Sequence, residues 1–142
     1  MKRTDEPVGF SNAKSALDLV LADFVPVRQW LPPLELVDLN RPNELPPNLG
    51  AWIASPEPGE AQVLLIVGDN RRRIEFGPDL VRAKVSFADY LQDEVIDRSG
   101  RPWPEVVVNG QTVVLTPRAE GGQAMWMGQD GVARPVGELW AE

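Results

Sequence analysis

An Asn-Gly pair at residues 109 and 110 constrains the fold of the C-terminal part of this 142-residue chain more than any other feature. The pair lies between two valine-rich runs, residues 106–108 and 112–115. Asn and Gly tolerate the positive φ that a type I′ turn requires at both central positions, and such turns match the twist of two antiparallel strands. We therefore predict a β-hairpin here.

Further short strands are predicted over the rest of the segment from Trp103 to Leu139. One connection, residues 116–122, contains Pro117 and a Gly-Gly pair, and another covers residues 128–131. Two more strands follow, at residues 125–127 and 132–133, which makes four successive strands in an antiparallel β-meander. Within it, we expect Trp126 in the core and Trp103 as a cap of the meander.

Apolar residues recur at helical spacing in two segments. The first is residues 11–24, with Ser11 as N-cap and Pro26 just beyond its end. The second is residues 86–98, where Ser86 and Asp89 match a capping box and Gly100 ends the helix. Residues 80–85 fit either a strand or a short helical turn, and we favour a strand.

The central part of the chain predicts a second hairpin. Residues 61–67 are a continuous apolar run, as expected for a strand buried on both faces, and a turn signal at 68–70 leads into the alternating residues 71–76. The predicted fold class is α+β, with two helices, a central hairpin and a C-terminal antiparallel β-meander. We expect residues 1–10 to be a flexible N-terminus and residues 11–142 to form a single domain.

A proline-rich segment, residues 26–58, holds eight of the 14 prolines, which excludes long helices and disfavours central strands. The segment is too apolar for a solvated linker, so we expect an ordered, extended arm with short edge strands at Leu36 and residues 51–54.

The prolines of this arm should limit its regular pairing with its own sheet and lower the entropy lost on binding. Tryptophan is also enriched at binding hot spots. The predicted partner-binding residues are Trp30, Leu31, Leu34, Leu45, Leu49, Trp52 and Trp140. The alternative is that the arm folds back and closes the core of a monomer.

Cysteine and histidine are both absent from the sequence. Their absence removes thiolate and imidazole chemistry, including the commonest zinc ligands and catalytic triads, so we expect no zinc and no cofactor. The net charge is −7, and neither half of the chain is basic. This charge balance disfavours nucleic acid and anionic membranes as partners. No apolar run is long enough to span a bilayer, and we expect a cytoplasmic protein.

Two charged clusters are candidate sites. Asp89, Asp93 and Asp97 recur at every fourth residue of the second predicted helix, so their carboxylates would form one stripe, with Glu94 beside it. The stripe would suit a divalent cation or a basic partner, but it also fits the solvated back of a helix. Residues 71–73 are all arginine, which would suit an acidic protein partner or an exposed strand, and no phosphate-binding motif accompanies them.

Four short motifs occur in the second helix and the meander: Leu91-Gln92-Asp93, Trp103-Pro104, Gly-x-Ala-x-Trp at 122–126 and Val-Gly-x-Leu at 136–139. In these motifs, residues 86–139 resemble small uncharacterised proteins of GC-rich bacteria, in which a Cys-Pro-x-His cluster and a second Cys-Pro form a zinc-knuckle-like meander. The Cys and His positions fall near Val106, Asn109 and Gly128 here. The resemblance therefore implies a meander and one helix, without the zinc ligands and without an activity.

Together these exclusions favour a non-enzymatic protein–protein interaction module. It would be an adaptor, an inhibitor or immunity-type protein, or a subunit of a larger assembly, and it would bind a protein partner or itself. The alternative is a carboxylate-dependent hydrolase or metal-dependent enzyme that uses Asp89, Asp93 and Asp97, with Arg72 or Arg73.

Overall fold

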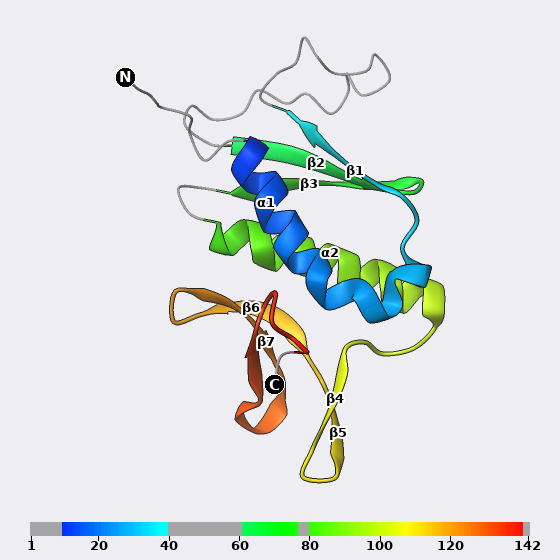
Figure 1. Ribbon diagram of the computed structural model, residues 1–142, viewed down its shortest axis with the longest axis vertical. Helices are drawn as coiled ribbons and strands as arrows, with labels where there is room; N and C mark the ends of the chain where they lie inside the picture. The colour runs from blue at the N-terminus through cyan, green and yellow to red at the C-terminus, as the bar shows by residue number, and fades with distance from the viewer. Residues whose placement is uncertain (1–9, 40–60, 77–79, 141–142) are drawn as a thin grey trace.

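The computed structural model of the protein describes residues 10–39, 61–76 and 80–140. Figure 1 shows these residues in layers, with the β1–β2–β3 sheet at the top, the helices across the middle and the C-terminal strands below. The helices are α1 (Phe10–Leu21), the 3-10 helix η1 (Ala22–Trp30), α2 (Val81–Ser99) and a short η4 (Gln129–Gly131). The strands are β1 (Leu34–Asp38), β2 (Ala61–Val67), β3 (Asn70–Phe76), β4 (Glu105–Val108), β5 (Gln111–Val114), β6 (Thr116–Glu120), β7 (Gln123–Met127) and β8 (Ala133–Pro135). The predicted α+β class is confirmed.

The first sheet contains β1, β2 and β3 in that order, all antiparallel. β2 and β3 form the predicted central hairpin, with Val67 opposite Asn70, so that only Gly68 and Asp69 make the turn. β1 pairs with β2 from Leu34 to Asp38, which confirms a strand at Leu36. Our expectation that prolines would limit pairing of the arm with its own sheet was wrong for these residues, because none of them is a proline. The rest of the arm, including the strand expected at residues 51–54, lies outside the described residues.

The first helix begins and ends differently from our prediction. α1 begins at Phe10, which packs partly against the core, so Ser11 lies inside the helix and the expected flexible N-terminus does not include Phe10. Residues 1–9 lie outside the described part. Instead of stopping before Pro26, the chain continues as η1 through Trp30, with a kink at Val27. Proline has no N–H to bond the carbonyl oxygen of Asp23, three residues earlier, and Nε1 of Trp140 donates to that oxygen instead, at 2.8 Å.

The strand that we favoured at residues 80–85 is wrong, because α2 already begins at Val81. Ser86 is therefore inside the helix and is not its N-cap. The extra turn adds Ala83 to a fully buried stripe that continues through Phe87 and Leu91, and this burial outweighs the strand preference of the valines. The predicted end is confirmed, since Gly100 has a left-handed backbone and its N–H bonds the carbonyl of Ile96.

The predicted C-terminal hairpin is confirmed, but the strands that follow it differ from the prediction. Asn109 and Gly110 both have positive φ, 53° and 80°, and join β4 to β5 as predicted. The expected connection at residues 116–122 instead contains β6, so there are five strands in two sheets, β4–β5 and the meander β6–β7–β8. Pro117 is tolerated because β6 is an edge strand and needs no donor on its outer side.

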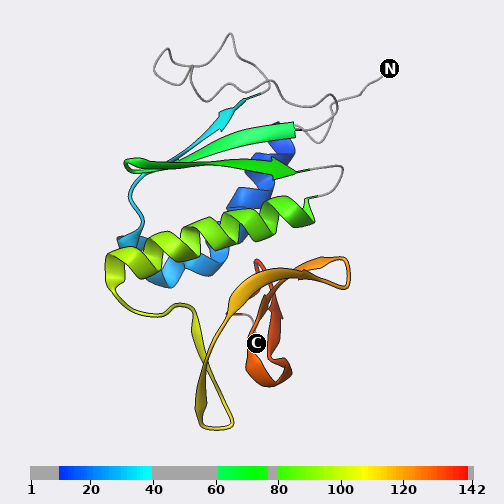
Figure 2. The same cartoon turned by 180° about the vertical axis from the view of Figure 1, so that it is seen from behind.

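One hydrophobic cluster joins the two halves of the fold. Figure 2 shows α2 between the first sheet and the C-terminal strands, and α2 contacts β3, β6 and β7. Trp126 is fully buried, as predicted, and Trp103 packs against both its ring and that of Phe24, with ring centroids 5.9 and 4.6 Å away. Gln92 fastens α2 to the strands, because its Nε2 donates to the carbonyls of Trp103 and Leu115 at 2.9 and 2.7 Å.

A single carboxylate ties the C-terminal segment to η1. Asp23 is 1% exposed, and its two oxygens accept hydrogen bonds from Trp126 Nε1 (2.8 Å), Gly137 N (2.6 Å) and Leu139 N (2.9 Å). Such a buried carboxylate is tolerable only where donors replace the water that it loses. Asp23 therefore couples the start of η1 to residues more than a hundred positions later in the chain.

Candidate functional site

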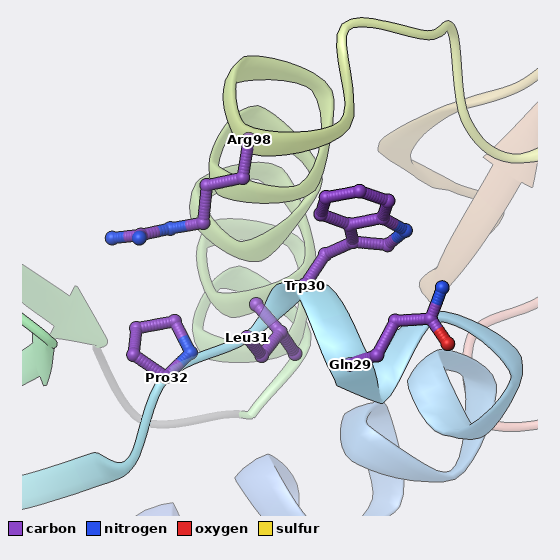
Figure 3. Close-up of a pocket in the computed structure, with 5 residues that line it drawn as sticks. All are labelled: Gln29, Trp30, Leu31, Pro32 and Arg98. Atoms are coloured by element: carbon purple, nitrogen blue, oxygen red, sulfur yellow. The ribbon is translucent and has the colours of Figure 1, made fainter.

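A groove of about 420 Å³ lies where η1 leads into the first sheet, next to the last turn of α2. Gln29, Trp30, Leu31, Pro32 and Arg98 line it. Figure 3 shows Arg98 reaching from α2 towards Pro32, while Trp30 and Gln29 project from η1. The groove thus combines four consecutive residues of the arm with one cation that is distant in sequence.

The arm side of the groove is held by backbone contacts on both sides of Leu31. The N–H of Leu31 bonds the carbonyl of Arg28 at 3.0 Å and ends η1, and the N–H of Gly68 bonds the carbonyl of Pro33 at 3.3 Å. A Cβ at Gly68 would lie only 2.9 Å from Cγ of Pro32, so glycine lets the β2–β3 turn close directly against the groove wall. The arm side of the groove is therefore held by contacts within the chain itself.

Arg98 is held in place by a buried carboxylate. Its Nε and Nη2 donate to Oε1 of Glu94 at 3.2 and 3.0 Å, and Nδ2 of Asn70 donates to both oxygens of the same carboxylate at 3.1 and 3.0 Å. We had expected Glu94 beside the exposed acidic stripe, but Glu94 is buried, with only 6% of its surface exposed. Nη1 of Arg98 has no hydrogen-bond partner among the described residues.

Two of the seven predicted partner-binding residues, Trp30 and Leu31, line the groove. Trp30 is 36% exposed, whereas Leu31 and Leu34 pack partly against the main core, which gives Leu34 a structural role in β1. Trp140 is 41% exposed but lies away from the groove lining, held by its bond to Asp23 and by the ring of Trp103 at 6.4 Å. Leu45, Leu49 and Trp52 lie outside the described residues.

Sequence reasoning missed Gln29, Pro32 and Arg98 as groove residues. The adjacent pair Pro32-Pro33, two residues after Trp30, was a usable signal for a stiff apolar wall. Nothing in the sequence links Arg98 to that wall, because only the packing of α2 against the sheet brings them together.

The acidic stripe on α2 is partly paired with the arginine cluster on β3. Arg72 bonds Asp89 at 3.3 Å and Asp93 at 3.4 Å, and all three side chains are substantially exposed. Exposed pairs of this kind contribute about 0–1 kcal/mol to stability. Among residues 10–39, 61–76 and 80–140, no group of three or more potential metal-ligating side chains is present.

Tyr90 lies beneath this ion pair. The guanidinium carbon of Arg72 is 4.4 Å from the centre of the Tyr90 ring, a cation–π contact. The Tyr90 hydroxyl is buried and has no hydrogen-bond partner in the described part of the chain. Burial, with a smaller contribution from the negative charge of Glu94, raises the pKa of Tyr90 above its usual 10.0. The phenol therefore stays neutral over the physiological range.

Comparison of the chain with known protein families, curated proteins and solved structures found no match. The resemblance of residues 86–139 to zinc-knuckle-like bacterial proteins thus stays a prediction. No helix in the described ranges is long and apolar enough to cross a membrane.

Proposed function

We propose that this chain is a non-enzymatic protein-interaction module, and that its partner binds in the groove around Trp30. The observation that carries the proposal is that Trp30 is 36% exposed and lines a groove whose arm side is held by contacts within the chain. Covering the exposed part of this side chain, roughly 80–90 Å², would contribute about 2 kcal/mol to binding. That is the size of effect seen at interface hot spots.

Rigidity supports the same role. Pro32 and Pro33 restrict the backbone, and the Gly68 turn holds them from behind. A surface that is already ordered loses little conformational entropy when a partner docks. The absence of cysteine suits a reducing compartment, which supports a cytoplasmic location for this module.

Two features favour a binding role over a hydrolase or a metal-dependent enzyme. Asp89 and Asp93, the first two carboxylates that such an enzyme would use, lie in exposed ion pairs with Arg72 and do not line the groove. The groove itself is lined by no carboxylate and no hydroxyl nucleophile. Binding is therefore the chemistry that the lining residues support best.

The test is affinity capture from a lysate of the native host, followed by mass spectrometry. Wild type should retain a stoichiometric partner, or should self-associate in light scattering, and Trp30→Ala should weaken that binding at least tenfold. Val25→Ala is the matched control, because Val25 lies on the same helix, is 56% exposed and does not line the groove.

Two results would contradict the proposal. One is a complex that Trp30→Ala leaves intact although the variant remains folded by circular dichroism. The other is a catalytic turnover that Asp89→Asn or Asp93→Asn abolishes, which would favour the enzyme instead.

A further inference from the structure

The groove presents hydrogen-bond donors beside apolar surface. Nε1 of Trp30 and Nη1 of Arg98 have no acceptor within the described part of the chain, and the side-chain amide of Gln29 adds a donor and one acceptor. A partner that covers the groove removes these donors from water. It must therefore offer acceptors of its own, because a buried donor without a partner is unfavourable.

The lining holds one cation, whose charge is partly offset by its ion pair with Glu94. Arg98 is the only charged residue among the five that line the groove, and its side chain is 35% exposed. Glu94 occupies the Nε and Nη2 donors, which leaves Nη1 for a second acceptor. A carboxylate is the strongest acceptor that a protein partner can offer to a guanidinium.

The apolar and charged parts of the groove are separate. Figure 3 shows the indole of Trp30 and the guanidinium of Arg98 extending in opposite directions, with Leu31 and Pro32 below. A ligand that satisfies both needs a large apolar side chain and a carboxylate on neighbouring parts of one chain. A linear peptide has this arrangement without any fold of its own.

We infer that the groove binds a linear acidic segment of its partner, with an apolar side chain against Trp30 and an adjacent carboxylate on Arg98. The inference rests on the proposed function and specifies the chemistry of the partner. It predicts specificity for Asp or Glu next to a large apolar residue.

The test uses random linear peptides displayed on phage and selected on the immobilised wild-type protein. Enriched peptides should carry Asp or Glu beside a large apolar residue. In synthetic copies, replacing that acid by its amide should weaken binding at least tenfold in fluorescence polarisation. This substitution is on the peptide, so its outcome does not depend on the stability of any protein variant.

A protein variant tests Arg98 directly. The double variant Glu94→Gln, Arg98→Gln replaces the ion pair by two amides that can still hydrogen-bond. It should bind the acidic and amide peptides equally while still requiring Trp30. Arg101→Gln is the matched control, because Arg101 is an exposed cation just beyond α2 and does not line the groove. It should keep the full preference for the acidic peptide.

The outcomes separate this inference from the proposed function. Two results would overturn the inference and leave the proposed interaction module unaffected. One is a set of peptides that need Trp30 but show no preference for an acidic residue. The other is a double variant that still prefers the acidic peptide to its amide. Failure to enrich any peptide would also overturn it, even if a captured partner depends on Trp30. A partner insensitive to Trp30→Ala would overturn both.

Discussion

Asp23→Ala should destabilise the protein more than any other single substitution at a polar residue described here. The carboxylate of Asp23 accepts from Trp126 Nε1 and from the backbone N–H groups of Gly137 and Leu139, at 2.6–2.9 Å. Asp23, Trp126 and Leu139 are at most 1% exposed, so the bonds from Trp126 and Leu139 are shielded from water in the folded state, whereas the bond from Gly137 is partly buried.

The magnitude follows from the three donors that lose their acceptor. A buried donor left without a partner costs about 1–3 kcal/mol. Trp126 cannot reach water and should incur the full cost, whereas Gly137 and Leu139 lie near the chain end and can become hydrated if this segment detaches. We expect a total on the order of 3–5 kcal/mol, a large part of the roughly 5–15 kcal/mol that holds a domain of this kind folded.

The measurement is urea unfolding followed by circular dichroism and tryptophan fluorescence. Asp23→Asn keeps the shape and one acceptor oxygen, so its loss should be smaller than that of Asp23→Ala. Asp18→Ala, at an exposed aspartate of α1, should stay within about 0.5 kcal/mol of wild type. If Asp23→Ala were as stable as the Asp18 variant, the carboxylate would not hold the C-terminal segment and our account of the packing would fail.

Four further predictions concern the remaining parts of the molecule. Because the pKa of Tyr90 is raised above 10.0 in the folded state, the free energy of unfolding should not depend on Tyr90 ionisation below pH 10 and should fall as the pH rises through the raised value. Tyr90 is the only tyrosine, so phenolate absorbance reports it directly, and a folded-state midpoint at or below that of the urea-unfolded chain would refute this. Tyr90→Phe, which removes a buried hydroxyl without a partner in the described part, should unfold at equal or higher urea concentration than wild type. Gly110→Val should cost about 1–3 kcal/mol from backbone strain alone, since φ is 80° and a side chain there would meet nothing within 4 Å; a melting temperature equal to that of wild type would contradict it. Metal analysis after dialysis should find substoichiometric zinc, and chelators should leave the melting temperature unchanged, whereas a tight one-to-one zinc content would disprove the prediction.

The sequence alone determined those elements whose signals are local. The Asn109-Gly110 turn, the apolar strand at residues 61–67 and the end of α2 at Gly100 were all predictable, because each depends on backbone preferences or on burial that a few neighbouring residues reveal. The α+β class followed from these elements. The face of α2 was also predictable, since helical spacing alone places Phe87 inside and Asp89 outside.

The tertiary structure decided everything that depends on a distant partner. β6 exists because β7 pairs with it despite Pro117, and the first turn of α2 exists because Ala83 finds a place in the core. Neither signal is present in the local sequence, which favoured a loop and a strand.

The same reason applies to the candidate site. Trp30 and Leu31 could be named from the sequence as large apolar residues of a stiff arm, but Arg98 could not. Arg98 reaches the groove because α2 packs beneath the first sheet, where Glu94, itself bonded by Asn70, orients the guanidinium. Contacts between residues this far apart depend on how whole helices and sheets pack together. No short stretch of the sequence determines that packing.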